Sequence, residues 1–229
     1  MVTRIPARFE GIEVEIPGGK GIYPPSEDTF LLLDMVKRFV ESQQLVDVDP
    51  CRAALDMGSG AGLATIYLAR HFTRVDSIDI NPGAVAFVKS ELLRRGQLGR
   101  VTLVAGSLLD AFRDAQCRGT YSLACFNPPY LPPEDYECPG IKDGEDDREH
   151  AFYIDKALYA ADGGKAILEQ FLRIVKDYLV PGGHVFFVKS SLTGIEDTSA
   201  WATNLGFTIV EKSGIHAFFE DIEAYHAIA

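Results

Sequence analysis

Hydrophobic and polar residues along this chain follow the two periods that are typical of strands and helices. From Ala53 onward, short apolar runs of strand length are separated by stretches in which apolar residues recur every three or four positions. The expected strands cover residues 53–57, 74–79, 101–104, 122–126, 184–188, 207–211 and 224–228, and the expected helices cover 63–71, 82–95 and 167–179. Pro181-Gly-Gly183 is the expected stop of the last helix. Short buried strands between helices favour a mostly parallel sheet with both faces covered, so the pattern predicts the α/β class.

The residues before Ala53 have a different pattern. Apolar and acidic residues alternate between Phe9 and Ile16, which predicts a short strand or hairpin within an N-terminal extension of residues 1–22. Tyr23-Pro-Pro-Ser-Glu-Asp-Thr29 has the composition of a helix entry, and the apolar residues from Phe30 to about Val40 predict a buried helix. With this extension we expect a single domain over residues 1–229.

Composition and charge exclude several classes of protein. The 229 residues include 22 Lys and Arg against 33 Asp and Glu, a net charge of −11. Binding nucleic acid over a broad face depends on Lys and Arg that neutralise phosphates, so we expect no direct nucleic-acid binding. No apolar run is long enough to span a membrane, and the first residues lack the apolar core of a secretory signal. The four cysteines lack metal-ligand spacing, so we expect no metal site and a cytoplasmic location.

A glycine-rich segment, Asp56-Met-Gly-Ser-Gly-Ala-Gly62, joins the first strand of the α/β region to its helix. In an open parallel sheet this position binds ligands, and glycine lets the chain turn sharply and a ligand approach the backbone. Gly58, Gly60 and Gly62 have the spacing G-x-G-x-G. A dinucleotide fingerprint would place its third glycine at position 63, which is leucine, so an NAD-dependent oxidoreductase is disfavoured.

Asp79 stands at the end of the second strand of the α/β region, 23 residues after Asp56. A carboxylate at this position can accept hydrogen bonds from both hydroxyls of an adenosine ribose. Together with the glycine segment, Asp79 predicts a site for adenosine with an uncharged or cationic tail.

The sequence Asn127-Pro-Pro-Tyr130 directly follows another predicted strand, where it would lie beside the ligand crevice. The amide oxygen of Asn127 and the backbone carbonyl of Pro128 are two acceptors that suit a planar –NH₂ group. Pro128 and Pro129 stiffen the turn and remove competing N–H donors. The ring of Tyr130 can stack on a flat amide or base. We therefore expect all four residues to bind substrate, and Asn127, Pro128 and Tyr130 to serve in catalysis.

Taken together, these motifs resemble those of a class I S-adenosylmethionine-dependent methyltransferase that acts on nitrogen. Two further segments, Tyr23-Pro-Pro-Ser-Glu-Asp-Thr-Phe-Leu-Leu-Leu-Asp34 and Asp162-Gly-Gly-Lys-Ala-Ile-Leu-Glu-Gln-Phe171, narrow the resemblance. They are similar to the HemK-like protein glutamine N5-methyltransferases, in the archaeal and eukaryotic branch that modifies translation release factors. The resemblance covers most of residues 23–190.

The resemblance implies a Rossmann-like class I methyltransferase fold with a mostly parallel seven-stranded sheet. It implies S-adenosylmethionine as cofactor, bound by Thr29, Asp56, Gly58, Gly60, Gly62, Asp79, Ser107, Leu108 and Asn127. The family usually has an acidic residue that contacts adenine where this chain has Ser107, so adenine recognition would use that hydroxyl or backbone groups. Thr29 can instead be only a residue of the helix start.

The resemblance also implies partners. The substrate would be the glutamine of the Gly-Gly-Gln motif in a class I translation release factor. A small zinc-binding activator protein would form a heterodimer at the sheet edge, on the apolar strand Val101–Ala105.

Two other functions remain open on the sequence. The Asn-Pro-Pro-Tyr motif is shared with adenine N6-methyltransferases that act on DNA or RNA, but these need a basic groove, whereas the residues after Tyr130 are acidic. A catalytically silent cofactor-binding scaffold is the second alternative, and the intact Asn127 and glycines argue against it.

More than half of the negative charge lies in one segment. Glu134–Glu149 contains eight acidic residues, with Lys142 and Arg148, for a net charge of −6. It is either a solvated loop or an acidic rim that attracts a basic substrate and repels phosphate backbones.

Overall fold

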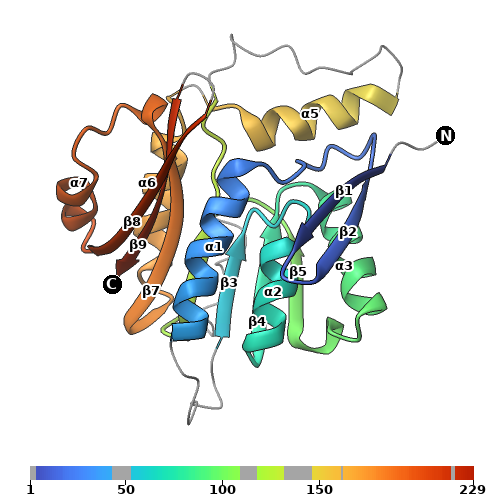
Figure 1. Cartoon of the computed structure of the whole chain (residues 1–229), viewed down its shortest axis with the longest axis horizontal. Helices are drawn as coiled ribbons and strands as arrows, with labels where there is room; N and C mark the ends of the chain where they lie inside the picture. Colours follow the sequence, from blue (N-terminus) through green and yellow to red (C-terminus); the bar gives the residue numbers. More distant parts are fainter. Residues whose placement is uncertain (1–3, 43–52, 109–117, 132–145, 161, 218–219) are drawn as a thin grey trace.

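The computed structural model describes residues 4–42, 53–108, 118–131, 146–160, 162–217 and 220–229 (Figure 1). The strands are β1 Arg4–Phe9, β2 Ile12–Pro17, β3 Ala53–Met57, β4 Arg74–Asp79, β5 Val101–Ala105, β6 Tyr121–Phe126, β7 Leu179–Ser190, β8 Thr208–Ala217 and β9 Glu220–Ile228. The helices are α1 Glu27–Ser42, α2 Leu63–His71, α3 Pro82–Arg94, α5 Asp146–Leu158, α6 Lys165–Val175 and α7 Thr198–Asn204, with 3₁₀ turns η1 Leu98–Arg100 and η3 Ser191–Thr193.

Seven of the strands form one sheet in the order β5-β4-β3-β6-β7-β9-β8. The first five strands of this order are parallel, and β9 pairs antiparallel with β7 and with β8. The predicted α/β class and mostly parallel seven-stranded sheet are therefore confirmed. Because the chain goes from β3 to β4 and β5 on one side and then continues to β6 on the other, the strand order reverses between β3 and β6. This is the position at which open α/β sheets bind their ligands.

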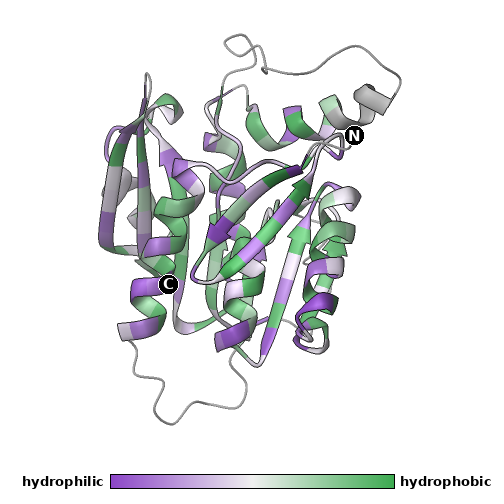
Figure 2. Ribbon diagram, turned by 45° about the vertical axis from the view of Figure 1, so that its right-hand side comes forward, coloured by the Kyte–Doolittle hydropathy of each residue, from purple (hydrophilic) through white to green (hydrophobic). Residues whose placement is uncertain are grey.

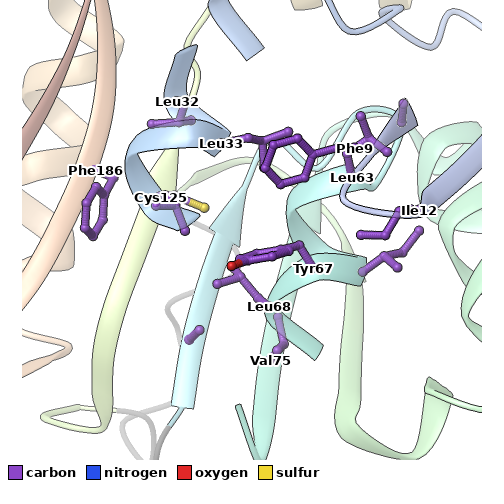
Figure 3. Close-up of a cluster of buried hydrophobic side chains, with 14 of the residues drawn as sticks. Phe9, Ile12, Leu32, Leu33, Leu63, Tyr67, Leu68, Val75, Cys125 and Phe186 are labelled. Carbon is purple, nitrogen blue, oxygen red and sulfur yellow. The ribbon is translucent and has the colours of Figure 1, made fainter. Parts of the chain in front are cut away.

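Helices cover both faces of the sheet. Neighbouring residues of a strand point to opposite faces, so adjacent residues of β3 belong to different clusters. Ala54 faces a cluster that includes α1, α2 and α3, whereas Leu55 faces a cluster that includes α6 and α7. Figure 3 shows part of the first cluster, in which Phe9 and Ile12 of the β1–β2 hairpin lie against α2. The rings of Phe9 and Tyr67 meet edge to face, with centroids 5.5 Å apart.

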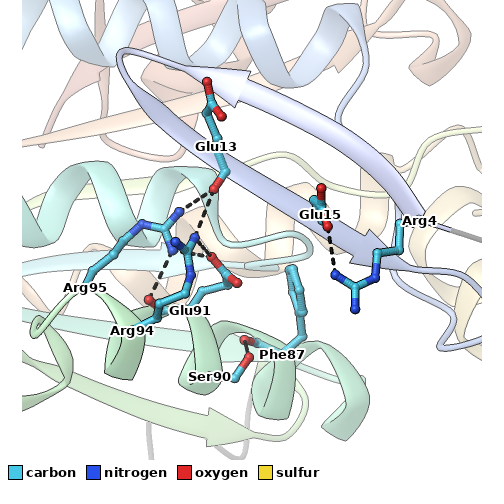
Figure 4. A network of polar contacts seen from close by, with 8 residues as sticks. All are labelled: Arg4, Glu13, Glu15, Phe87, Ser90, Glu91, Arg94 and Arg95. Carbon is cyan, nitrogen blue, oxygen red and sulfur yellow. Dashed lines mark hydrogen bonds and ion pairs between the residues drawn. The ribbon is translucent and has the colours of Figure 1, made fainter.

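The N-terminal alternation belongs to a hairpin rather than to one strand over 9–16. Glu10 and Gly11 both have positive φ, 46° and 69°, which is the backbone of a tight hairpin turn between β1 and β2. One side of each strand is buried and the other exposed, and the alternation is visible in Figure 2. The guanidinium groups of Arg94, the last residue of α3, and of Arg95, which follows it, donate to the carbonyl of Glu13 and connect the hairpin to the end of α3 (Figure 4).

The prediction of a helix over 167–179 is wrong at its end. Helix α6 stops at Val175, and Leu179 already belongs to β7, where it pairs with Tyr121. The carbonyl of Tyr178 accepts hydrogen bonds from the backbone N–H groups of Thr120 and Tyr121, both at 2.9 Å. The helix therefore ends about one turn before the predicted residue 179, because the backbone there pairs with β6 instead. Pro181-Gly-Gly183 does not stop the helix but lies inside the long strand β7.

No helix within the described residues is both long and apolar enough to cross a membrane.

Candidate active site

A cavity of about 410 Å³ lies at the carboxyl ends of the parallel strands, and residues of α5 form part of its wall. In Figure 1, α5 lies above these strand ends. The structure brings every site residue predicted from the sequence to its wall. These residues are Thr29, Asp56, Gly58, Gly60, Gly62, Asp79, Ser107, Leu108, Asn127, Pro128, Pro129 and Tyr130. The roles of the individual residues remain predictions. The glycine segment and the turn Asn127–Tyr130, which are far apart in sequence, line the same cavity.

The glycine segment is held to the neighbouring strand by backbone hydrogen bonds. The N–H groups of Gly58 and Ser59 both donate to the carbonyl of Ile78, at 2.8 and 3.1 Å. A Cβ at Gly60 would have no atom closer than 4.0 Å, so the backbone there is open to a ligand. A Cβ at Gly62 would lie 2.7 Å from a methyl group of Val88, so this glycine is required by the packing of α2 on α3.

Asp79 is buried and its carboxylate is fixed by the backbone. Oδ2 accepts from the N–H of Gly60 at 2.7 Å and Oδ1 from the N–H of Asn81 at 2.8 Å. Burial raises the pKa of this carboxyl, and the two N–H groups oppose the rise. Each oxygen keeps further acceptor capacity for ribose hydroxyls. Ile80, next to Asp79, is 45% exposed in the cavity wall and offers an apolar face that the sequence analysis did not single out.

Asp56 has protein partners on both carboxylate oxygens. The hydroxyl of Thr65 donates to Oδ2, and the thiol of Cys125 donates to Oδ1 at 3.5 Å. Burial raises the pKa of Asp56 to about 6, although these two hydrogen bonds oppose the shift. Asp56 therefore supports the glycine segment from within the protein.

The turn Asn127–Tyr130 is organised by a residue that sequence reasoning assigned only to the helix start. Asp28 on α1 is 3% exposed, and its Oδ2 accepts from Nδ2 of Asn127 at 2.9 Å and from the hydroxyl of Tyr130 at 3.1 Å. The hydrogen bond to Nδ2 fixes which way the Asn127 amide faces. Oδ1 of Asn127 is then buried in the cavity wall and has no hydrogen-bond partner among the described residues.

The position of Thr29 follows from the same carboxylate. Its backbone N–H and its hydroxyl both donate to Oδ1 of Asp28, at 2.6 and 3.2 Å. Asp28 and Thr29 lie in the first turn of α1, far in sequence from the turn Asn127–Tyr130. This network of hydrogen bonds could therefore not be predicted from the sequence.

The cavity fits S-adenosylmethionine in its chemistry. Its charged wall residues are three carboxylates (Asp28, Asp56 and Asp79) and one ammonium group (Lys156), a balance that favours a cationic ligand. Ser59 adds a buried hydroxyl without a partner among the described residues. Asp79 would hold the ribose, Ile80 and Leu108 would contact the base, and the open backbone at Gly60 would border the methionine part.

Two histidines lie together away from the cavity. Nδ1 of His184 is 2.8 Å from Nε2 of His226, and the ring of Phe39 packs on both. His184 pairs with Leu123 toward the amino end of β6, so this pair is remote from the cavity at the carboxyl ends. Burial and the neighbouring His184 lower the pKa of His226 to about 4.

The chain is similar to known methyltransferases. Residues 54–137 match the family model described as a methyltransferase domain. A protein of Methanocaldococcus jannaschii, provisionally named a protein N5-glutamine methyltransferase, is 29% identical over 220 residues, which are 96% of each chain. Methyltransferase HEMK2 of Mus musculus is 28% identical over 181 residues, 74% of this chain and 72% of that protein.

A solved structure has the same fold. The E. cuniculi Mtq2–Trm112 complex, described as responsible for methylation of the eRF1 translation termination factor, aligns with a TM-score of 0.55 at 20% identity. The alignment covers 91% of this chain and 98% of that one. The predicted class I methyltransferase fold and the resemblance to glutamine N5-methyltransferases are thus confirmed, and the chain is an S-adenosylmethionine-dependent methyltransferase.

Proposed function

We propose that this cytoplasmic enzyme methylates the side-chain nitrogen of a glutamine in a protein, and that this glutamine lies in the Gly-Gly-Gln motif of a class I translation release factor. The observation that carries the proposal is the buried Oδ1 of Asn127, an acceptor with no partner in the described part of the chain and with its orientation fixed by Asp28. Buried acceptors are rarely left unpaired, so a donor from the substrate is expected there. The names of the M. jannaschii and E. cuniculi proteins support this substrate class.

The residues of the turn suit a carboxamide substrate. Oδ1 of Asn127 and the carbonyl of Pro128 would accept the two protons of the –NH₂ group, while Tyr130 packs beside the amide plane. Holding both protons favours a pyramidal nitrogen whose lone pair faces the reacting carbon. S-adenosylmethionine supplies an electrophilic methyl group on sulfur. As the new N–C bond forms and the S–C bond breaks, the nitrogen becomes acidic and its extra proton leaves to water, so the turn needs no strong base.

The far side of the cavity would receive the peptide around the glutamine. Tyr153 and Lys156 on α5, together with Ile167 and Gln170 on α6, line this part of the wall. The side chains of Lys156 and Gln170 can donate to the peptide carbonyls of an extended loop. The ammonium group of Lys156 lies 5.8 Å from the centroid of the Phe152 ring.

The edge of the sheet offers a site for an activator protein. Strand β5 is at one end of the strand order, and its residues Val101, Leu103 and Val104 are only partly buried. A small zinc-binding partner that covers this strand would remove an exposed sheet edge. The chain expressed alone and coexpressed with such a partner should differ in solubility and rate; full activity of the soluble monomer would count against an obligatory activator.

The experiment that tests the function compares acceptor classes. Purified enzyme, with and without the partner, is incubated with radiolabelled S-adenosylmethionine and either a class I release factor or adenine-containing DNA and RNA oligonucleotides. We expect label in the release factor alone. Label in the oligonucleotides alone would favour the adenine N6-methyltransferase alternative, and label in no acceptor would favour the silent scaffold.

A further inference from the structure

Glycine 164 occupies a position at which helices normally have a capping side chain. It is the N-cap of α6, a site where Ser, Thr, Asn or Asp is preferred because the side chain accepts from the first free N–H groups. Here that task is done from two residues upstream, where Oδ2 of Asp162 accepts from the N–H of Ala166 at 2.7 Å. Capping therefore does not explain the glycine at 164.

The backbone of the turn Asn127–Tyr130 lies directly against Gly164. A Cβ at this position would overlap the carbonyl oxygen of Pro129 and would lie 3.1 Å from Cβ of Tyr130. The φ angle of Gly164 is +82°, in the region that favours glycine. Both the backbone conformation and the close approach thus depend on the missing side chain.

The turn has little freedom to move away from such a side chain by itself. The rings of Pro128 and Pro129 fix two successive φ angles, which limits how far the Pro129 carbonyl can move independently of Pro128. The N–H groups of Tyr130 and Leu131 are bound to the carbonyl of Leu158, at 3.2 and 2.8 Å. Asp28 holds the side chains of Asn127 and Tyr130. Gly164 is a contact on the backbone of this turn in addition to those hydrogen bonds.

We propose that Gly164 is a positioning residue for methyl transfer: its bare Cα sets the place of the Pro129 peptide and, through the two prolines, of the acceptor atoms of Pro128 and Asn127. The inference rests on the proposed function for its kinetic consequence. The proposed cofactor half of the cavity lies around Gly60 and Asp79, whereas the three atoms nearest to a Cβ at 164 all belong to Pro129 and Tyr130. Cofactor binding should therefore survive a change at 164 while turnover is lost.

The test is the variant Gly164→Ala with two matched controls that lie far from the cavity. Gly182→Ala adds a Cβ at a similar φ, +71°, with no atom within 4 Å, so it reproduces only the backbone strain. Gly183→Ala places a Cβ 2.9 Å from the carbonyl oxygen of Val180 and 3.0 Å from Cβ of Leu179, so it reproduces the close contact with a backbone oxygen and a side chain without the positive φ. Gly164→Asn is made as well, because asparagine tolerates positive φ better than alanine and gives a second chance of a folded protein.

We expect kcat of both Gly164 variants to fall by roughly 10²-fold, since a shift of about 1 Å in a positioning group has this effect. The Kd for S-adenosylmethionine should stay within about threefold of the wild-type value, less than 1 kcal/mol. The controls should keep the wild-type kcat. The NMR signal of the Asn127 side-chain amide should move in the Gly164 variants and stay in place in both controls.

Wild-type kcat in a folded Gly164 variant, or an unmoved Asn127 amide signal, would overturn the inference. If the wild-type enzyme itself transfers no methyl group to a release factor, the proposed function fails, and the NMR comparison still decides the role of Gly164.

Discussion

At the scale of single residues, the site depends on one buried carboxylate. Oδ2 of Asp28 accepts hydrogen bonds from both Asn127 and Tyr130, and its other oxygen accepts from Thr29. Because Nδ2 of Asn127 donates to this carboxylate, Oδ1 of Asn127 points elsewhere and has no partner among the described residues. In the proposed function this oxygen binds the substrate.

Removal of the carboxylate should therefore impair turnover. In Asp28→Ala the amide of Asn127 is free to rotate, and we expect kcat to fall by roughly 10²-fold, as for other misplaced positioning groups. Asp28→Asn keeps one acceptor oxygen and should lie between the alanine variant and the wild type. Asp34→Ala, an exposed position on the same helix, is the control for lost charge. A wild-type kcat for Asp28→Ala would show that Asn127 is oriented by other contacts.

Asp56 should make stability depend on pH. Burial raises its pKa from 3.8 to about 6, so the folded state holds the proton more tightly than the unfolded state. The resulting stabilisation is complete below the unfolded pKa and is lost as the pH rises through about 6. Relative to Asp56→Asn, which cannot ionise, the wild type should lose up to about 3 kcal/mol of unfolding free energy between about pH 4 and pH 7. Urea titrations of both proteins at both pH values measure the unfolding free energies. The same change with pH in the wild type and in Asp56→Asn would contradict the prediction.

At the scale of elements, the sequence predicts strands and helices whose boundaries depend on nearby residues. It does not predict boundaries that depend on pairing between distant strands. The helix Leu63–His71 and the strands Ala53–Met57 and Arg74–Asp79 match the expected ranges, because buried strands and their glycine or proline boundaries are local signals. The wrong end of α6 arises because β7 pairs with β6 already at Leu179. The contact of Asp28 with Asn127 joins residues 99 positions apart, so no spacing in the sequence could indicate it.

The packing of α2 on α3 gives a prediction at this scale. A Cβ at Gly62 would lie 2.7 Å from Val88, whereas one at Gly96, with a similarly positive φ, would meet no atom within 4 Å. Gly62→Ala should therefore lower the unfolding free energy by about 1–3 kcal/mol more than Gly96→Ala does, since overpacking adds to the same backbone strain. Thermal and urea denaturation measure the difference. The loss in the double variant Gly62→Ala/Val88→Ala should be smaller than the sum of the losses of Gly62→Ala and Val88→Ala, since Val88 is buried and contacts position 62. Equal losses for Gly62→Ala and Gly96→Ala would exclude the packing role.

At the scale of the whole molecule, the fold gathers one cavity from segments spread over more than 140 residues. The reversal of strand order between β3 and β6 places the glycine segment and the turn Asn127–Tyr130 at the same edge, so two motifs that follow different strands become neighbours. The approach of Gly58 to the ring of Phe126, 3.3 Å from a Cβ built at 58, shows how close the two segments lie. The glycine segment and the turn Asn127–Tyr130 therefore line one cavity side by side.

The uneven charge of the chain gives a prediction about substrate capture. Residues 134–145 of the acidic segment Glu134–Glu149 lie outside the described residues, and 146–149 begin α5. The substitutions Glu134→Gln, Asp135→Asn and Glu137→Gln remove three negative charges. If the segment attracts a basic substrate, the triple variant should have a higher KM for the release factor at low salt and a smaller change at high salt. Steady-state kinetics at two salt concentrations tests this. An unchanged KM at low salt would leave only the solvated loop.

The proposed function is tested most directly by tandem mass spectrometry of a class I release factor after incubation with the enzyme and S-adenosylmethionine. With the wild-type enzyme we expect one added methyl group on the glutamine of the Gly-Gly-Gln motif. With Asn127→Ala, which we expect to retain cofactor binding, the rate should be lower by roughly 10²–10³-fold, as for the loss of one preorganised polar group. A methyl group on any other residue, or wild-type rates for Asn127→Ala, would contradict the proposed function.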